Sequence, residues 1–158
     1  METLPAFYEP IKGLQVVASQ EKAEGIEVIA FSMKKAAVCP RCGCTNNHKH
    51  SRYWRTLRDL PVSGKQVTLV LRSNKWFCLH RSCPVRVFTE RLEGISSSKR
   101  NTDRLQLVLQ ELAFSMSAKA AERCSRAMGT PTSHDTFLYL IRAAPEAPIE
   151  ESPFRRYR

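Results

Sequence analysis

The sequence predicts an α+β fold in which a β-rich segment precedes three helices. Three observations support this class. Apolar and polar residues alternate in the first half of the chain, as they do in half-buried strands. After residue 101, apolar residues recur every three or four positions, which is the period of a helix face. Five of the six cysteines fall within the β-rich segment.

The β-rich segment contains five expected strands. They are Leu14–Ala18, Ile26–Phe31, Ser51–Leu57, Gln66–Arg72 and Asn74–Cys78. A polar turn at 21–25 joins the first two strands into a hairpin, and residues 59–64, which are rich in turn-forming residues, join the next two.

Three helices are expected after the small, polar stretch at 96–100. Their N-caps are Asn101 or Thr102, Ser117 and Ser133. Gly129 ends the second helix, as a glycine past a helix end commonly does. A glycine-bearing turn between the last two helices is typical of a helix-turn-helix.

The cysteines form two closely spaced pairs, Cys39 with Cys42 and Cys78 with Cys83. Two tight turns of this kind bring four thiolates to one cation, and Zn²⁺ accepts four sulfur ligands in a tetrahedron. We therefore expect a zinc ribbon. Its metal is expected to be structural, because four protein ligands leave no open position for water.

Other ligands remain open near these pairs. Cys44, His50 or His80 could replace one of the four cysteines, although ordinary polar side chains are the simpler interpretation. Cys124 lies on an apolar helix face, where we expect a small buried thiol.

The charge of the chain is concentrated in one segment. The whole chain carries +10. Residues 33–100 carry fifteen basic side chains against three acidic ones, so this segment alone is +12. Such a concentration is typical of a protein that binds a polyanion, the alternative being a basic surface that serves solubility.

These features predict four units: an N-terminal hairpin at 1–35, a zinc ribbon at 36–96, a helix-turn-helix at 97–143 and a flexible tail at 144–158. No apolar stretch approaches the roughly 20 residues of a membrane span, and the N-terminus lacks the features of a secretory signal. We therefore expect a cytoplasmic protein with reduced thiols and no membrane partner.

Several motifs, in order, resemble the N-terminal part of the bacterial ISL-three family of insertion-sequence transposases. They are Cys39-Pro-x-Cys-Gly, His50 to Pro61, Trp76-Phe77-Cys78 with Cys83-Pro84, Val87 to Leu92, and Asn101 to Arg142. In that family, a zinc finger and a helix-turn-helix bind the terminal inverted repeats of the transposon. A nuclease domain with three acidic residues then transfers the strands.

The resemblance implies a DNA-binding remnant of a transposase, or a regulator derived from one. We expect no enzyme activity and no catalytic residue, because Glu146, Glu150 and Glu151 on the tail cannot be the widely separated triad of the family. The expected partner is double-stranded DNA, and a homodimer is left open.

Candidate DNA contacts come from both halves of the chain. From the helices they are Ser133, His134, Thr136, Arg142, Arg123 and Arg126, and from the ribbon they are Arg52, Arg55 and Arg58. Ser133 could equally serve only as a cap. Tyr53, Trp54, Trp76 and Phe77 are expected to pack beneath the basic residues rather than to stack on bases. The second class of function is a protein-interaction module with an incidental basic patch.

Overall fold

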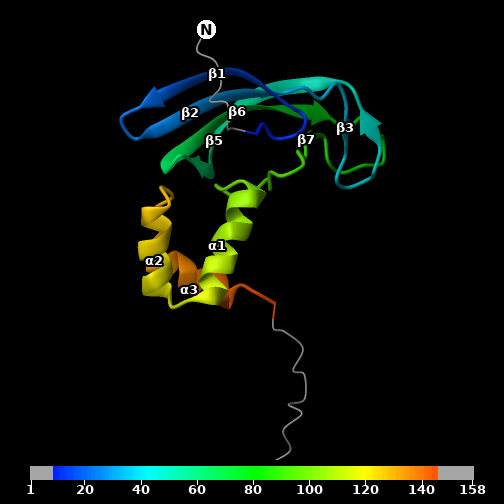
Figure 1. Ribbon diagram of the computed structural model, residues 1–158. Helices are drawn as coiled ribbons and strands as arrows, with labels where there is room; N and C mark the ends of the chain where they lie inside the picture. Colours follow the sequence, from blue (N-terminus) through cyan, green and yellow to red (C-terminus); the bar gives the residue numbers. More distant parts are fainter. Residues whose placement is uncertain (1–8, 146–158) are drawn as a thin grey trace, which may run out of the picture.

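The computed structural model describes residues 9–145. A twisted β-sheet forms one layer, and three helices lie together on one side of it (Figure 1). The α+β class is confirmed. Within the described residues, no helix is long and apolar enough to cross a membrane. The predicted tail at 144–158 lies almost entirely outside the described residues.

The elements follow one another from strands to helices. The strands are β1 (Leu14–Lys22), β2 (Gly25–Ser32), β3 (Ala37–Val38), β4 (Thr45–Asn46), β5 (Lys49–Val62), β6 (Lys65–Phe77) and β7 (Val87–Thr89). The helices are α1 (Asp103–Ser115), α2 (Ala118–Ala127) and α3 (His134–Arg142).

The main sheet has the strand order β1-β2-β6-β5, and β7 pairs with one end of β6. The predicted hairpin is confirmed as the antiparallel pair β1 and β2. β2 then runs parallel to β6, with Ile26 opposite Val67 and Phe31 opposite Arg72. The N-terminal hairpin and the ribbon segment therefore share one sheet.

The long ribbon of β5 and β6 differs from its prediction in two ways. The strand expected at Asn74–Cys78 is not separate, because β6 continues without a break to Phe77. The turn is also shorter than 59–64: β5 extends to Val62, and Ser63 and Gly64 alone connect the strands. Both have positive φ values, 51° and 74°, which is the backbone of a type I′ hairpin turn.

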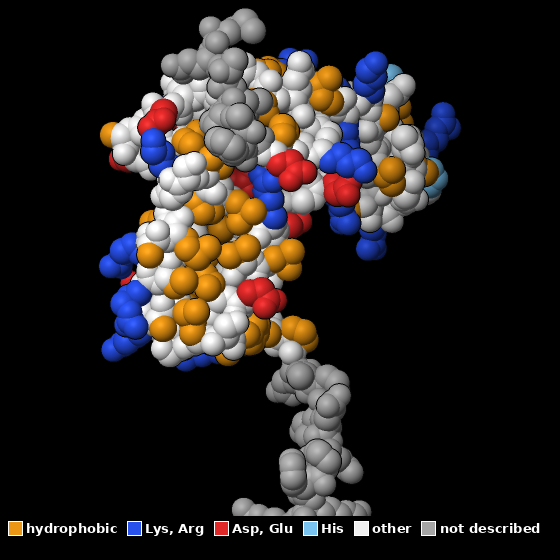
Figure 2. Space-filling view, viewed as in Figure 1, with side chains coloured by type: hydrophobic (Ala, Val, Ile, Leu, Met, Phe, Trp, Pro, Cys, Tyr) orange, Lys and Arg blue, Asp and Glu red, His pale blue; other side chains and the backbone are white. Residues whose placement is uncertain are grey.

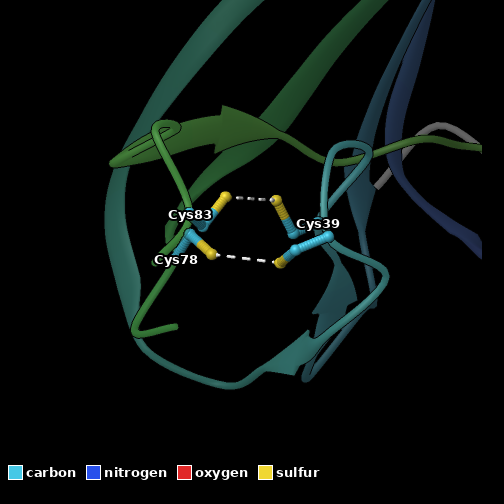
Figure 3. A group of neighbouring side chains, drawn as sticks. Cys39, Cys78 and Cys83 are labelled. Carbon is cyan, nitrogen blue, oxygen red and sulfur yellow. Dashed lines mark hydrogen bonds between the residues drawn. The ribbon is translucent and has the colours of Figure 1, made fainter. Parts of the chain in front are cut away.

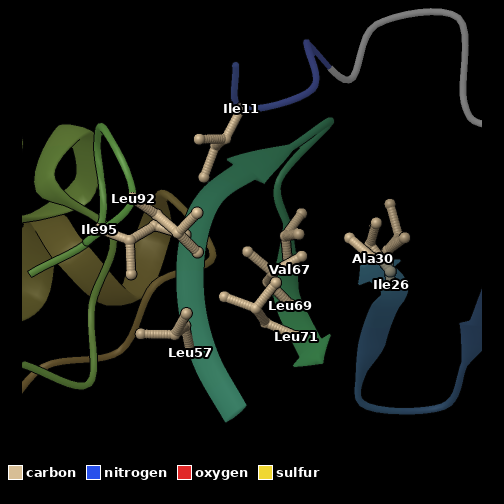
Figure 4. Close-up of a cluster of buried hydrophobic side chains, with 10 residues drawn as sticks. Ile11, Ile26, Ala30, Leu57, Val67, Leu69, Leu71, Leu92 and Ile95 are labelled. Atoms are coloured by element: carbon tan, nitrogen blue, oxygen red, sulfur yellow. The ribbon is translucent and has the colours of Figure 1, made fainter. Parts of the chain in front are cut away.

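One face of the sheet carries the buried core. Its core includes Val28, Leu57, Val67, Leu69 and Leu71, whose side chains alternate along their strands as the sequence pattern predicts. Two irregular segments cover these residues: one contributes Ile11, and the other contributes Leu92 and Ile95 (Figure 4). No helix supplies a buried side chain to this cluster.

The three helices form a second core of their own. Their buried side chains are Leu105, Leu109, Ala113, Ala121, Phe137 and Leu140. Thr102, Ser117 and Ser133 are the N-caps, and each side-chain oxygen accepts a hydrogen bond from a backbone N–H in the first turn. Gly129 follows α2 with a φ of 82°, as expected of a residue past a helix end.

A buried carboxylate fastens the helices to the sheet. Asp59 of β5 has a fully buried side chain and accepts two hydrogen bonds from the Arg104 guanidinium, at 2.7 and 2.5 Å. The Thr102 hydroxyl donates to the same carboxylate at 2.7 Å. The start of α1 is thus fixed to β5 by a charge-assisted, two-pronged contact.

The end of the β5–β6 ribbon, including its turn, contacts the turn between α2 and α3. Arg58 donates to the hydroxyls of Thr130 and Thr132 at 2.7 and 3.1 Å, in the turn between α2 and α3. Gly129 lies so close to the Gly64 carbonyl that a Cβ added at residue 129 would sit 2.0 Å from that oxygen. Only a glycine fits this approach.

We predict that Gly129→Ala lowers the free energy of unfolding by about 2–5 kcal/mol. The positive φ costs about 1–2 kcal/mol and the overlap with the Gly64 carbonyl adds about 1–3 kcal/mol. Gly13→Ala is the matched control, since Gly13 has a φ of 81° but open space around it. Urea unfolding measures both, and an equal loss in the two variants would contradict the close approach.

Asp59→Asn is expected to lower the free energy of unfolding by about 3–5 kcal/mol, because it leaves Arg104 without its buried charge partner. Glu93→Gln is the control: Glu93 forms an exposed ion pair with Lys12, and such pairs contribute at most about 1 kcal/mol. Denaturant midpoints of the two variants test the difference. Equal midpoints would show that Asp59 does not hold the layers together.

Candidate metal centre and basic surfaces

Two loops at one end of the sheet bring four cysteines together. Cys39 and Cys42 lie on the loop between β3 and β4, and Cys78 and Cys83 lie on the loop between β6 and β7. Their sulfurs face one another across the gap between the loops (Figure 3). All four sulfurs lie within 4.8 Å of one another.

The sulfur positions fit a tetrahedral zinc ion. Zinc–sulfur bonds of about 2.3 Å place the sulfurs of a tetrahedron about 3.8 Å apart. The Sγ atoms of Cys39 and Cys83 are 3.9 Å apart, and those of Cys42 and Cys78 are 3.6 Å apart. Four soft sulfur donors at these separations suit zinc better than a cation that prefers oxygen. With all four positions taken by protein, such a centre would be structural.

The thiols ionise unequally when they lie together. A backbone hydrogen bond from Cys44 lowers the pKa of the Cys42 thiol to about 6. Burial raises the pKa of Cys78 to about 12, and burial also raises the pKa of Cys83. One thiolate therefore forms readily at Cys42, and further negative charge is opposed. A divalent cation is what would allow four thiolates to coexist here.

Local structure holds the two loops in place. The Cys39 N–H donates to the Cys44 carbonyl at 2.9 Å, and Gly43, with a φ of 73°, closes the first loop by donating to the Cys39 carbonyl at 3.0 Å. Asn46 links the two loops, because its buried side chain donates to the Cys44 carbonyl at 2.9 Å and accepts from the Leu79 N–H at 3.0 Å. Sequence reasoning did not single out Asn46, which looks there like any polar loop residue.

A small apolar core surrounds the sulfurs. It includes Ala37, Trp76 and Phe88, and it is separate from the core of the main sheet. Glu90 closes it: its buried carboxylate accepts from the Asn74 N–H at 2.7 Å and from the Trp76 indole at 3.3 Å. Three of the six buried residues in this core are cysteines, so half of the cluster belongs to the candidate metal centre.

The alternative ligands differ in their positions. Cys44 and His80 each have a ligand atom within 4.8 Å of the Cys42 sulfur, so both lie beside the centre. His50 belongs to no such group among residues 9–145, and its ring packs against Phe77 with centroids 4.7 Å apart. Cys124 is partly exposed rather than buried, and its thiol lies 3.8 Å from the Met128 sulfur.

Two of the three ribbon arginines proposed as DNA contacts are used within the chain. Arg58 reaches the α2–α3 turn, and burial lowers the pKa of its guanidinium. Arg55 donates to the carbonyls of Ser96 and Lys99 at 3.0 and 2.8 Å and holds the segment that leads to α1. Arg52 is exposed. The sequence pattern did not reveal these roles, because the backbone carbonyls and hydroxyls that accept from the two arginines lie far along the chain.

The residues proposed at the start of α3 are also partly engaged. Ser133 caps the helix, and its hydroxyl lies 3.0 Å from that of Thr136. The His134 ring lies 3.5 Å from a carboxylate oxygen of Glu122 on α2. Arg123, Arg126 and Arg142 are exposed. The expectation for the rings holds for Trp76, which is fully buried, but not for Trp54 and Phe77, which are 55% and 40% exposed.

A β-rich unit closed by two cysteine-bearing loops defines a zinc ribbon. Residues 35–83 match the family model described as the zinc-finger of transposase IS204/IS1001/IS1096/IS1165. This match covers the long ribbon and all four clustered cysteines, and Cys83 is its last residue. The sequence resemblance is thus confirmed for the zinc-ribbon region. No curated protein and no solved structure matches the chain.

We predict that removing zinc loosens only one end of the sheet. Structural zinc typically contributes about 10 kcal/mol or more, and half of the buried residues in the core at this end are cysteines. Amide exchange should therefore accelerate in β3, β4 and β7 after chelation, while β2 and the helices keep their protection. Loss of protection throughout the sheet, or none anywhere, would contradict a local structural centre.

Single cysteine variants identify the ligands in the same experiment. Cys78→Ser is expected to abolish stoichiometric zinc binding, and Cys44→Ser is expected to retain one zinc per chain. Zinc content is measured directly by elemental analysis. Loss of zinc in Cys44→Ser would place that thiol in the ligand set.

Proposed function

We propose that this chain is a zinc-dependent DNA-binding protein of transposase origin that recognises the terminal inverted repeats of a transposon. The observation that carries the proposal is the match of residues 35–83 to a transposase zinc finger, combined with four sulfurs spaced for one zinc ion. The proposed partner is double-stranded DNA. The proposed role is binding rather than catalysis, because four thiolates leave the metal no position for water.

The helices supply the surface that best fits duplex DNA. In the proposed helix-turn-helix, α2 and α3 pack against each other through a turn held by buried Ser125, Thr130 and Thr132. Lys119, Arg123 and Arg126 are exposed along one side of α2, and basic side chains line that edge of the helical layer in Figure 2. Such residues suit phosphate contacts, with the start of α3 directed at base edges.

A second candidate function is a protein-interaction module, including a homodimer. The observation that favours it is a set of large apolar side chains exposed on the helices (Figure 2). Leu107 is 62% exposed, Phe114 58% and Tyr139 68%. An exposed apolar surface of this kind is often an interface. If the chain binds duplex DNA while it is a monomer, the DNA-binding function is favoured over the interaction module.

The test measures binding of the zinc-loaded chain to inverted-repeat duplex and to scrambled duplex by fluorescence anisotropy at several salt concentrations. Arg123→Ala with Arg126→Ala is expected to weaken binding to both duplexes and to reduce the salt slope by about 2, since each phosphate contact contributes about 0.9. The control, Lys12→Ala with Lys22→Ala, removes the same charge from exposed sites outside the helices.

Equal loss in the two double variants would show that only net charge matters, which would contradict a defined interface. Equal affinity for repeat and scrambled duplex would contradict recognition of transposon ends. No duplex binding together with self-association would favour the interaction module.

A further inference from the structure

The second face of the main sheet is not covered by the helices. The helices and the segments carrying Ile11, Leu92 and Ile95 all lie on the side of the buried core (Figures 1 and 4). On the opposite face, the side chains of β2 and β6 are half-buried and those at the β5 edge are exposed. We call this the outer face.

One row of the outer face is aromatic and cationic. Strand register places Phe31 of β2 opposite Arg72 of β6, and Arg72 opposite Trp54 of β5. The Arg72 guanidinium lies 3.4 Å above the Phe31 ring centre and 5.9 Å from that of Trp54. The two rings meet edge to face, with centroids 5.8 Å apart. Three flat groups from three strands therefore form one preassembled cluster.

The neighbouring row of the same face carries β-branched side chains and no ring or charge. Ile29, Val70 and Thr56 follow one another across the same three strands. A base stacked beside the aromatic row would meet this surface without a bulky obstruction. Trp54, with 55% of its area exposed, stands at the sheet edge, where a large ring left in water is unfavourable unless something covers it.

The charge of this face favours an anionic ligand. Arg52 is exposed and lies two residues before Trp54 on β5, so its side chain shares the face that carries Trp54 and its cross-strand partner Arg72. A carboxylate on the face, Glu27, is already bound by Lys22 at 2.8 Å and by Gln20 at 2.6 Å. Arginines beside exposed rings are typical of surfaces that hold a phosphate backbone while bases stack.

The shape of the face selects single strands over duplexes. Four strands, with about 4.8 Å between neighbours, span about 14 Å before side chains are counted. The major groove is about 12 Å wide and admits a helix or a two-stranded ribbon, so this sheet cannot enter it face-on. Unpaired bases, by contrast, stack on aromatic side chains of open sheets.

From these observations we infer that the outer face binds single-stranded nucleic acid, with an unpaired base stacked on the cluster of Phe31, Arg72 and Trp54. The backbone phosphates of that strand lie toward Arg52. This site is distinct from the duplex contacts proposed for the helices, and it does not depend on them.

The test is titration of the zinc-loaded full chain with a fluorescent 12-nucleotide oligo-dT. Wild type is expected to bind it, and Trp54→Ala is expected to weaken binding by about tenfold or more, since stacking on one ring contributes substantially to each base held. Trp54→Phe is expected to recover most of the affinity. Tyr139→Ala is the matched control, because it removes an even more exposed ring from the helices.

Tryptophan fluorescence provides a second readout. Trp76 is fully buried, so quenching by the oligonucleotide should come from Trp54 and should disappear in Trp54→Phe, while duplex affinity stays within about twofold. Absence of oligo-dT binding by wild type, or equal losses in Trp54→Ala and Tyr139→Ala, would overturn the inference. Self-association of wild type that Trp54→Ala abolishes, without quenching by oligo-dT, would overturn it in favour of a protein contact.

Discussion

The pairing of β5 with β6 is the constraint on which the rest of the structure depends. β6 has thirteen residues and extends about 40 Å. At one end, β6 leads directly into Cys78, and the start of β5 follows the loop of Cys39 and Cys42. At the other end, the Ser63–Gly64 turn meets the α2–α3 turn. The metal centre and the helices are thus held apart by one continuous ribbon.

This arrangement explains why the chain has three small cores instead of one. The cysteine end, the sheet and the helices each bury their own apolar set. The joint between the sheet and the helices is polar, through Asp59 and Arg104, and a buried carboxylate, Glu90, holds Trp76 at the cysteine end. A bidentate arginine–carboxylate contact fixes the relative orientation of the two layers that it joins, whereas apolar packing allows that orientation to vary.

Local signals in the sequence were sufficient for the N-terminal hairpin, the three helices and the cluster of four cysteines. The serine and threonine caps, the glycine after α2 and the spacing of four cysteines all act over a few residues, and each led to the correct local structure or cluster. The ribbon turn was misjudged because Asp59 and Pro61 look like turn residues. Here Asp59 is the buried acceptor of the helix joint, and Pro61 sits on an edge strand, where it blocks no pairing.

The partners of long-range contacts could not be predicted from the sequence pattern, because that pattern reports only on neighbouring residues. Arg55 and Arg58 look like the other basic residues of the ribbon, and nothing within ten positions of either one reveals their acceptors, which lie 41 to 74 residues away. The same holds for Trp54, whose exposure depends on which sheet face the helices leave open.

The fate of these arginines changes how the charge of the chain should be understood. The +12 of residues 33–100 suggested that the ribbon provides the affinity for DNA. Two of its arginines instead build the joint to the helices, and a third, Arg72, is stacked on Phe31. Eleven of the fifteen basic residues of this segment remain exposed, so its positive surface persists beside the exposed basic residues of α2.

The positions of the two proposed nucleic-acid surfaces relative to the sheet have a mechanical consequence. The helices lie on the side of the sheet core, and the cluster of Phe31, Arg72 and Trp54 lies on the other side. A duplex held by α2 and α3 would not cover that cluster, so both surfaces could be occupied at once. The contacts of Asp59 and Gly129 fix the helices to the sheet. The distance between the two proposed nucleic-acid surfaces is therefore fixed as well. A nucleic acid that is paired at one end and unpaired at the other is the ligand that could use both surfaces together.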